Sequence, residues 1–180
     1  MSCTNTLIGL GTSCKNELGG ISEAYFIDFE SVESVTTTGG SITALTLASG
    51  EKFKTYKFDE NVSNWSSTRS VNNGIGVYNA VINLQFKTLE AAKNVEVSAL
   101  AEGHLAGIIK NRSGRYFFFG KDGYLTSNDS ASAETGTNYD DFNGYNLVLN
   151  GQSAYFPFEI PKELFEANKS TWIEDAPATA

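Results

Sequence analysis

The chain has 180 residues, a net charge of −8 and an isoelectric point near 4.6. This length suits one domain that buries a sufficient core without disulfides or metal. With 13 basic against 21 acidic residues, the composition argues against a surface that grips nucleic acid, because that affinity comes mainly from Lys and Arg neutralising phosphates. No apolar run approaches the length that spans a bilayer, so we expect a soluble protein.

Residues 1–20 are expected to form an N-terminal arm. Cys3 and Cys14 both lie in it, without His or Cys neighbours at metal-ligand spacing. We interpret them as free thiols, with a disulfide or a ligand pair as the alternatives. The start of the chain lacks the basic segment and the long apolar core of a signal peptide, so synthesis in the cytoplasm is expected.

Alternation of apolar and polar residues predicts a mainly β domain over residues 21–160. Strands are expected at 24–29 and 41–47, around the Gly39-Gly40 turn, and at 52–58. The alternation is clearest over 76–86, which predicts a strand with one face in the core.

The period changes at Thr88, where the pattern predicts an amphipathic helix over about 88–101. Thr88 is the expected N-cap. Leu89, Ala92 and Leu100 are expected to face the sheet, so the helix would cover the core.

Two hairpins are expected after the helix. Residues 105–109 and 115–120 form the first, and the run at 116–119 does not alternate, which indicates a strand covered on both faces. Asn150-Gly151 lies between two alternating runs, which predicts a type I′ turn because both central residues of that turn need positive φ. A short helix at 162–167 and a tail would form a C-terminal extension, residues 161–180.

A long polar segment at 127–143 precedes the second of these hairpins. From residue 122 to 161 the chain has no Lys or Arg, and its acidic residues there are Asp122, Asp129, Glu134, Asp140, Asp141 and Glu159. Such a loop usually binds a ligand or pairs with another subunit. It is either a solvated loop or a surface that faces a polyanion without binding it.

Catalytic residues are scarce. His104 is the single histidine and lies beside an apolar strand, which favours a structural or surface role over that of a general base. Asp140 and Asp141, with Asn143, could offer oxygen ligands to Ca²⁺, but their spacing fits no EF-hand. A hydrolase using these carboxylates is the weakest hypothesis, and we expect neither enzymatic activity nor a cofactor or metal.

A resemblance to a known family rests on five segments in a fixed order. They are the AYFIDF strand at 24–29, the strand ending in LQF at 84–86, the helix from 88, the hairpin AGIIKNRSGRYFFFGKDGYL at 106–125 and the closing TGTNYDDFNGYNLVLNGQSAYFPFEI at 135–160. This order resembles that of bacteriophage tail tube proteins and related tube-fold subunits of contractile injection systems. The likeness covers roughly residues 21–160 and is strongest to versions from phages of Bacteroidetes.

The resemblance implies a mainly β fold, a single β-sandwich or barrel domain with one flanking α-helix, which assembles into stacked hexameric rings around a channel for the genome. It also implies a non-enzymatic virion structural protein of the tail, assembled in the host bacterial cytoplasm. Such a protein binds itself and other tail or neck proteins, and DNA passes it without being gripped. A ring would protect strand edges by pairing them with the next subunit, and an acidic lining would repel DNA.

The polar loop and the arm at 11–20 are the contacts between subunits that this hypothesis predicts. The interface residues expected in the loop are Tyr139, Asp140, Asp141, Phe142 and Asn143.

Two alternatives stay open. A neck, tail-completion or decoration protein of the virion would share these features. A β-sandwich module for carbohydrate binding or adhesion would use Trp65, Tyr139 and Tyr145, with Asp140 or Asp141 as polar anchors.

Overall fold

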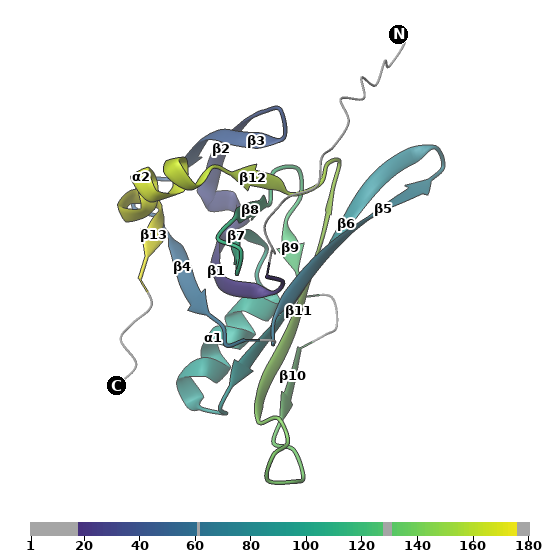
Figure 1. Cartoon of the computed structure of the whole chain (residues 1–180), viewed down its shortest axis with the longest axis vertical. Helices are drawn as coiled ribbons and strands as arrows, with labels where there is room; N and C mark the ends of the chain where they lie inside the picture. The colour runs from purple at the N-terminus through teal and green to yellow at the C-terminus, as the bar shows by residue number, and fades with distance from the viewer. Residues whose placement is uncertain (1–17, 61, 128–130, 176–180) are drawn as a thin grey trace.

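The computed structural model describes residues 18–60, 62–127 and 131–175, and within these ranges the chain is mainly β. Its strands join into one hydrogen-bonded sheet that folds into two layers, with a helix beside them (Figure 1). This confirms the predicted mainly β domain with a flanking helix. Cys3, Cys14, most of the predicted arm and Asp129 lie outside the described residues.

The strands divide between the layers as follows. The first layer contains, in spatial order, β4 (Phe53–Lys57), β1 (Ile21–Asp28), β7 (Leu105–Asn111), β8 (Tyr116–Phe119) and β12 (Phe158–Ile160). It continues at its two ends into β3 (Ser41–Leu47) with β2 (Val32–Thr38), and into β13 (Ile173–Glu174). The second layer, which we call the open sheet, contains β5 (Asn64–Asn72), β6 (Ile75–Lys87), β11 (Gly144–Ser153) and β10 (Ala131–Glu134).

Short elements connect these parts. A 3-10 turn, η1 (Phe29–Ser31), leads from β1 into β2, and β9 (Leu125–Thr126) pairs with both β7 and β11. Strand β9 therefore joins the two layers.

Apolar cores lie on both faces of the first layer. The core between the layers includes Phe26, Ile82, Leu84, Ile109, Leu147 and Leu149. The other core lies beneath helix α2 (Lys162–Trp172) and the β2–β3 hairpin. In β8, Tyr116 and Phe118 belong to one core while Phe117 and Phe119 contact the other, which confirms that this strand is covered on both faces.

Helix α1 (Ala91–Glu102) confirms that a helix follows β6, but not its predicted start, and its apolar and polar residues are only weakly segregated. Thr88 is not the N-cap, because its φ is 71° and its N–H donates to the carbonyl of Asn143 at 2.9 Å. Val97 and Leu100 are buried, whereas Ala92 is exposed. The expected position of Ala92 was wrong because the helix begins at Ala91, so its first turn lies beyond the edge of the core.

Asn150-Gly151 does not form the predicted turn. Both residues lie inside β11, where Asn150 is opposite Val81 and Gly151 is opposite Ala80. Glycine at 151 serves close packing instead, because a Cβ there would lie 2.7 Å from Cδ2 of Leu125.

The Asn-Gly pair that does form a type I′ turn is Asn73-Gly74, which joins β5 to β6. Its φ values are 51° and 80°, as a type I′ turn requires. Strand β5 was absent from the sequence prediction because its Ser- and Thr-rich run offers few apolar residues to mark an alternation.

The C-terminal segment belongs to the domain. Helix α2 continues to Trp172, well past the predicted end at residue 167, and β13 pairs with β4 in parallel. Phe165 is fully buried and stacks on Tyr116 with ring centroids 4.0 Å apart. The segment therefore completes the core on that side of the first layer.

Replacing Phe165 by Ala should lower the free energy of unfolding by about 3–5 kcal/mol, because it leaves a large cavity under α2. Urea denaturation followed by circular dichroism measures this loss. Tyr139→Ala, at a fully exposed aromatic residue, is the matched control and should stay within about 0.5 kcal/mol. A loss below about 1 kcal/mol in Phe165→Ala would mean that α2 does not complete the core.

Candidate functional site

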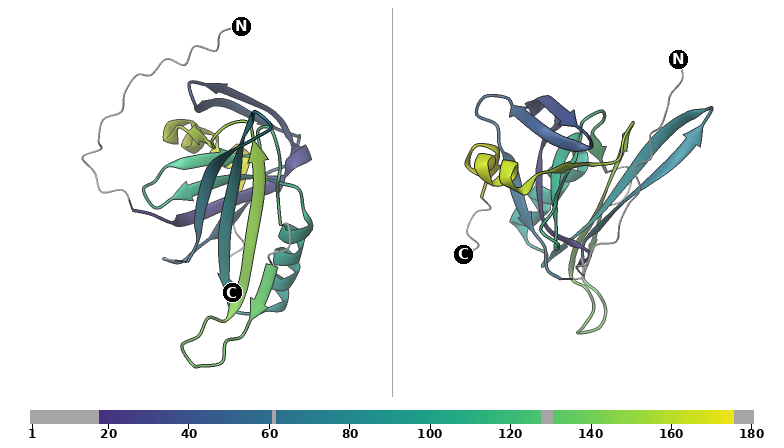
Figure 2. Two further views of the ribbon diagram at one scale, coloured as in Figure 1. Left: turned by 90° about the vertical axis from the view of Figure 1, so that its right-hand side faces the viewer. Right: turned by 45° about the horizontal axis from the view of Figure 1, so that its top comes forward.

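The outward face of the open sheet is the candidate functional site. Alternate residues of β6 and β11, such as Ile82, Leu84 and Leu149, point into the core. The residues that lie between them along each strand therefore point to the opposite, outward face. Figure 2 (left) looks onto this face, where the strands lie side by side toward the viewer.

This face is polar but nearly without charge. Its residues, from the strand register, are Asn64, Ser66, Thr68, Ser70, Ile75, Val77, Asn79, Val81, Asn83, Gln85, Lys87, Asn146, Val148, Asn150, Gln152, Ser132 and Glu134. Amide side chains link across the strands: Asn83 Nδ2 donates to Asn64 Oδ1 at 2.8 Å, and Asn79 Nδ2 donates to Ser70 Oγ at 2.9 Å.

The charged residues of this face, Lys87 and Glu134, lie at one end of it. Lys87 forms an ion pair with Asp59 at 2.8 Å, and hydrogen bonding to the Lys87 ammonium lowers the pKa of the Asp59 carboxyl. Glu134 accepts a hydrogen bond from Asn146 Nδ2 at 3.3 Å. The described residues of this face therefore present no unpaired cation that a polyanion could bind.

The described acidic residues of the polar segment do not gather on this face. Asp122 lies in the loop between β8 and β9, and Glu159 forms an ion pair with Arg115 at 3.6 Å, on β12 of the other layer. Of the acidic residues of this segment that the structure describes, Glu134 alone is on a strand of the face. The face is nearly neutral because the described acidic residues of this segment lie mostly in loops or on the other layer.

Among the described residues, the open sheet has an unpaired edge on each side. Within the described parts of the chain, β5 pairs only with β6, and β10 pairs only with β11. Proteins usually protect such edges with Lys, Pro or inward-pointing charges. Strand β5 has nine residues and no proline, and Arg69 is its single charge, while the edge strand β2 of the other layer carries the exposed Glu33. The β5 edge is thus a ready template for another strand.

The predicted interface residues lie at the β10–β11 connection, at the lower end of the molecule in Figure 1. Tyr139 is fully exposed and Phe142 is half-buried. Asp140 is exposed, and the Asn143 carbonyl accepts the Thr88 N–H. Part of the expected loop is the strand β10, so the segment is a hairpin with a nine-residue connection, 135–143, rather than one long loop.

Asp141 holds this connection in shape. Its Oδ2 accepts hydrogen bonds from the backbone N–H of Asn138 at 2.6 Å and of Thr137 at 2.7 Å. These bonds lower the pKa of the Asp141 carboxyl. Asp141 is therefore engaged within its own turn, and no cluster of three or more His, Cys, Asp or Glu residues that could hold a metal occurs in the described residues.

Because bonds to the carboxylate lower its pKa in the folded chain, Asp141 orders the turn above its ordinary pKa of 3.8, and this contribution is lost as the pH falls through the lowered value. A titration followed by NMR should show the Thr137 amide signal moving only below about pH 4. Asp141→Ala should speed amide exchange at residues 137–138 at neutral pH. Asp140→Ala is the neighbouring control, and equal exchange in both variants would contradict the assigned role.

The aromatic residues expected to form a sugar platform lie apart. Trp65 packs against Phe117 and Phe119 at 5.2 and 5.4 Å between ring centroids, and its Nε1 donates to Asn111 at 2.8 Å. Tyr145 is buried in β11. Tyr139 alone is exposed, so these three rings present no common surface.

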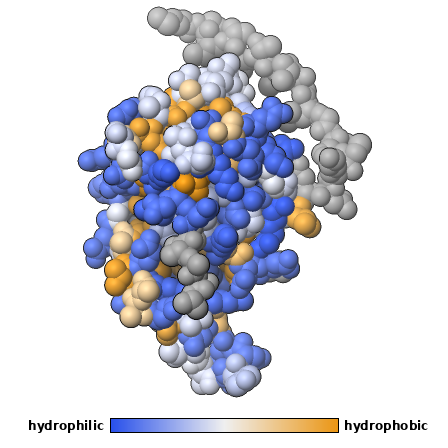
Figure 3. Space-filling model, turned by 90° about the vertical axis from the view of Figure 1, so that its left-hand side faces the viewer, coloured by the Kyte–Doolittle hydropathy of each residue, from blue (hydrophilic) through white to orange (hydrophobic). Residues whose placement is uncertain are grey.

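His104 is exposed and stacks on Tyr124 at 4.1 Å, while its carbonyl accepts the Phe29 N–H. The side of the molecule around α2, β13 and β4 is mostly hydrophilic, with apolar residues in small separate groups (Figure 3). Neither the His104–Tyr124 stack nor this hydrophilic side of the molecule resembles a binding site.

The chain matches no family model, no curated protein and no solved structure. Of the helices in the described ranges, none is long and apolar enough to cross a membrane.

Proposed function

We propose that this chain is a non-enzymatic virion structural subunit that assembles with copies of itself into stacked rings, forming the tail tube through which phage DNA passes. The observation that supports this most is the pair of free strand edges on the two sides of the open sheet. Pairing β5 of one copy with β10 of the next would satisfy both edges and extend the sheet around a ring.

The stagger of the two edges suits such a closure. Strand β5 is opposite residues 75–83 of β6, whereas β10 lies beside residues 144–147 of β11, which are opposite residues 84–87 of β6. The β10 edge therefore begins where the β5 edge ends along the strand direction. A sheet that closes into a barrel needs this kind of stagger, because its strands must tilt relative to the barrel axis.

The neutral polar face suits the lining of a DNA conduit. Ser, Thr, Asn and Gln side chains bind water but carry no positive charge. Few cations on the face could therefore replace the counterions of the DNA phosphates. The resemblance in the order of elements to tail tube proteins supports the same function. The separation of Trp65, Tyr139 and Tyr145 weighs against the carbohydrate-binding alternative.

Negative-stain electron microscopy of concentrated purified protein tests the proposal. We expect rings or short tubes, accompanied by a species larger than the 19.5 kDa chain in analytical ultracentrifugation. A chain that stays monomeric at every concentration would contradict the proposed function.

The assemblies should show no measurable retention of double-stranded DNA at physiological salt, because 13 basic residues are dispersed among 21 acidic ones and Lys87 is paired with Asp59. A gel-shift titration at two salt concentrations measures this. Tight binding that weakens steeply with salt would contradict a conduit that lets DNA slide.

A further inference from the structure

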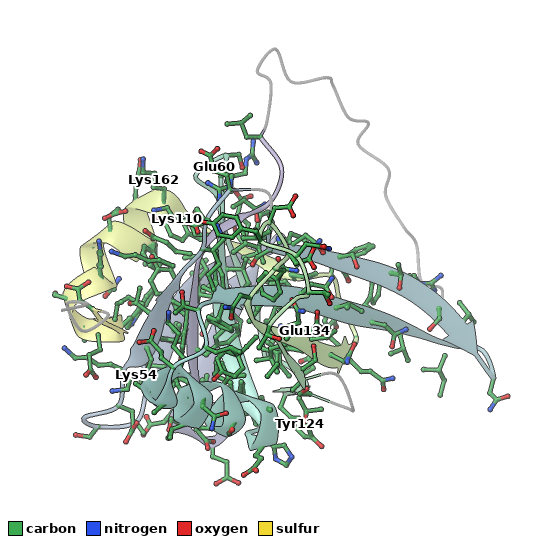
Figure 4. The ribbon with its side chains drawn as sticks, turned by 90° about the horizontal axis from the view of Figure 1, so that it is seen from below. Lys54, Glu60, Lys110, Tyr124, Glu134 and Lys162 are labelled. Atoms are coloured by element: carbon green, nitrogen blue, oxygen red, sulfur yellow. The ribbon has the colours of Figure 1, made fainter. Side chains whose placement is uncertain are left out.

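The β5–β6 hairpin ends in a tip with apolar side chains on both of its faces. Residues 68–79 extend away from the body as a two-stranded ribbon (Figures 1 and 4). We call this ribbon the arm from here on; it is distinct from the predicted N-terminal arm. At its tip Val71 is 55% exposed and Ile75 is 67% exposed. Val71 is opposite Gly76 and Ile75 is opposite Asn72, so the two side chains lie on opposite faces of the ribbon.

Apolar groups on both faces suit insertion better than surface contact. A ribbon that lies flat on a partner covers one face and leaves the other in water. A tip that enters a hollow buries both faces, and each aliphatic side chain then gains hydrophobic stabilisation.

A hollow lined by both apolar and polar side chains lies at the opposite end of the molecule, between α1 and β10, and its polar lining is Asn94, Ser98, Glu102 and Ser132. Its volume is about 250 Å³, and its apolar lining consists of Val97, Ala101, Ala131, Ala133 and Tyr145. An apolar cavity of about 150 Å³ holds a benzene-sized group. The α1–β10 hollow therefore has room for one or two aliphatic side chains.

The arm cannot fill the hollow of its own chain. In Figure 1 the arm rises at the upper end, while α1 and β10 lie at the lower end. Glu134, labelled in Figure 4, belongs to that lower end. An occupant from the arm must come from another copy.

The charges around the two surfaces are complementary. Arg69 is the only charged residue between 64 and 86, and it lies on the same face of the arm as Val71, two residues before it. Glu102 lines the hollow at the end of α1. A copy with its tip in the hollow can bring the guanidinium toward this carboxylate.

We propose that the arm of each subunit inserts Val71 and Ile75 into the α1–β10 hollow of a second copy in the adjacent ring, with Arg69 beside Glu102. This contact is heterologous, because the tip and the hollow are different surfaces, so it repeats from copy to copy and stacks rings without limit. It rests on the proposed function for the rings themselves, which uses the backbone edges of β5 and β10, whereas stacking uses side chains of the hairpin tip and of the hollow.

The first test is Ile75→Asp, compared with wild type by negative-stain microscopy. Because Ile75 is exposed in the monomer, the variant should fold. We expect it to form single rings that do not stack, while Val95→Asp, at an apolar residue of α1 that is 70% exposed and not part of the hollow, stacks like wild type. Normal tubes from Ile75→Asp would overturn the stacking contact and leave the ring proposal standing. Failure of Ile75→Asp to form rings would also overturn it, because the tip would then act within a ring, and a wild-type chain that never assembles would overturn both proposals.

The second test is a charge exchange. Arg69→Glu should raise the protein concentration needed for stacking by about tenfold, which corresponds to roughly 1.4 kcal/mol of binding free energy. Adding Glu102→Arg to it should restore stacking. If Arg69→Glu and Glu102→Arg each stack as readily as wild type, Arg69 and Glu102 do not form the proposed ion pair.

The third test is covalent trapping in a Cys3→Ser, Cys14→Ser background. The double variant Ile75→Cys, Ala133→Cys should give a ladder of disulfide-linked oligomers on mild oxidation, because each copy carries one thiol for each neighbour. Each single variant is its control and should give at most dimers. A double variant without species larger than dimers would overturn the contact.

Discussion

The Leu100→Asp variant is expected to lose more than about 4 kcal/mol of unfolding free energy, enough to leave a domain of ordinary stability unfolded. Leu100 is 5% exposed and belongs to the core between the two layers. The substitution removes an aliphatic group from this core and places a carboxylate among apolar side chains, where a charge without a partner is costly.

Circular dichroism and urea denaturation measure the effect. Val95→Asp introduces the same charge five residues earlier in α1 at an exposed position, so it should change stability by no more than about 0.5 kcal/mol. A folded, cooperative Leu100→Asp variant would show that α1 does not seal the core. The difference between the two variants separates burial from any effect of the charge on helix propensity.

The parts of the fold that could be predicted are those whose local pattern is long and regular. The strand at 76–86 has a clear period and a core face, and it was predicted. The α1 helix and the β7–β8 hairpin were also predicted, the helix with a start at Thr88 instead of Ala91. Strand β5 and strand β2 were missed, because Ser, Thr and Glu side chains on edge strands carry little apolar signal.

The two Asn-Gly pairs show why a strong local signal can fail. Asn73-Gly74 forms the turn, but Asn150-Gly151 runs through the middle of β11. At the second pair, β6 on one side and β9 on the other hold the chain extended, so tertiary pairing decides the conformation. No feature within a few residues of Asn150 distinguishes the two cases.

The outward face of the open sheet was not predicted from the sequence. The sequence pointed to residues 139–143, which lie at the connection into the open sheet, and their role at an interface stays a prediction. The uncharged face and the free β5 edge were missed, since Ser66, Asn79 and Asn150 acquire a common direction only through the register of three strands. The Asn73-Gly74 pair was the signal that could have revealed the hairpin and hence the edge.

The β5 edge can be tested with two neighbouring proline variants, Ser66→Pro and Ser67→Pro. Successive backbone N–H groups of a strand point to opposite sides, so one of these two bonds to β6 and the other points to the free edge. Proline removes the N–H in either case. It destabilises the strand where it breaks an existing ladder and is tolerated where the N–H faces outward on an edge strand.

One variant of the pair should therefore melt close to wild type, and we expect this variant to stay monomeric under conditions in which wild type forms rings. Thermal melts by circular dichroism identify it, and sedimentation with negative-stain microscopy reports its assembly. Both variants replace the same residue type at adjacent positions, so composition and charge are matched, while the direction of the lost N–H and the face that the side chain occupies both differ, with Ser66 exposed and Ser67 partly buried. If the variant that keeps its stability forms rings as readily as wild type, β5 does not pair with a neighbouring subunit, and ring closure must use another surface.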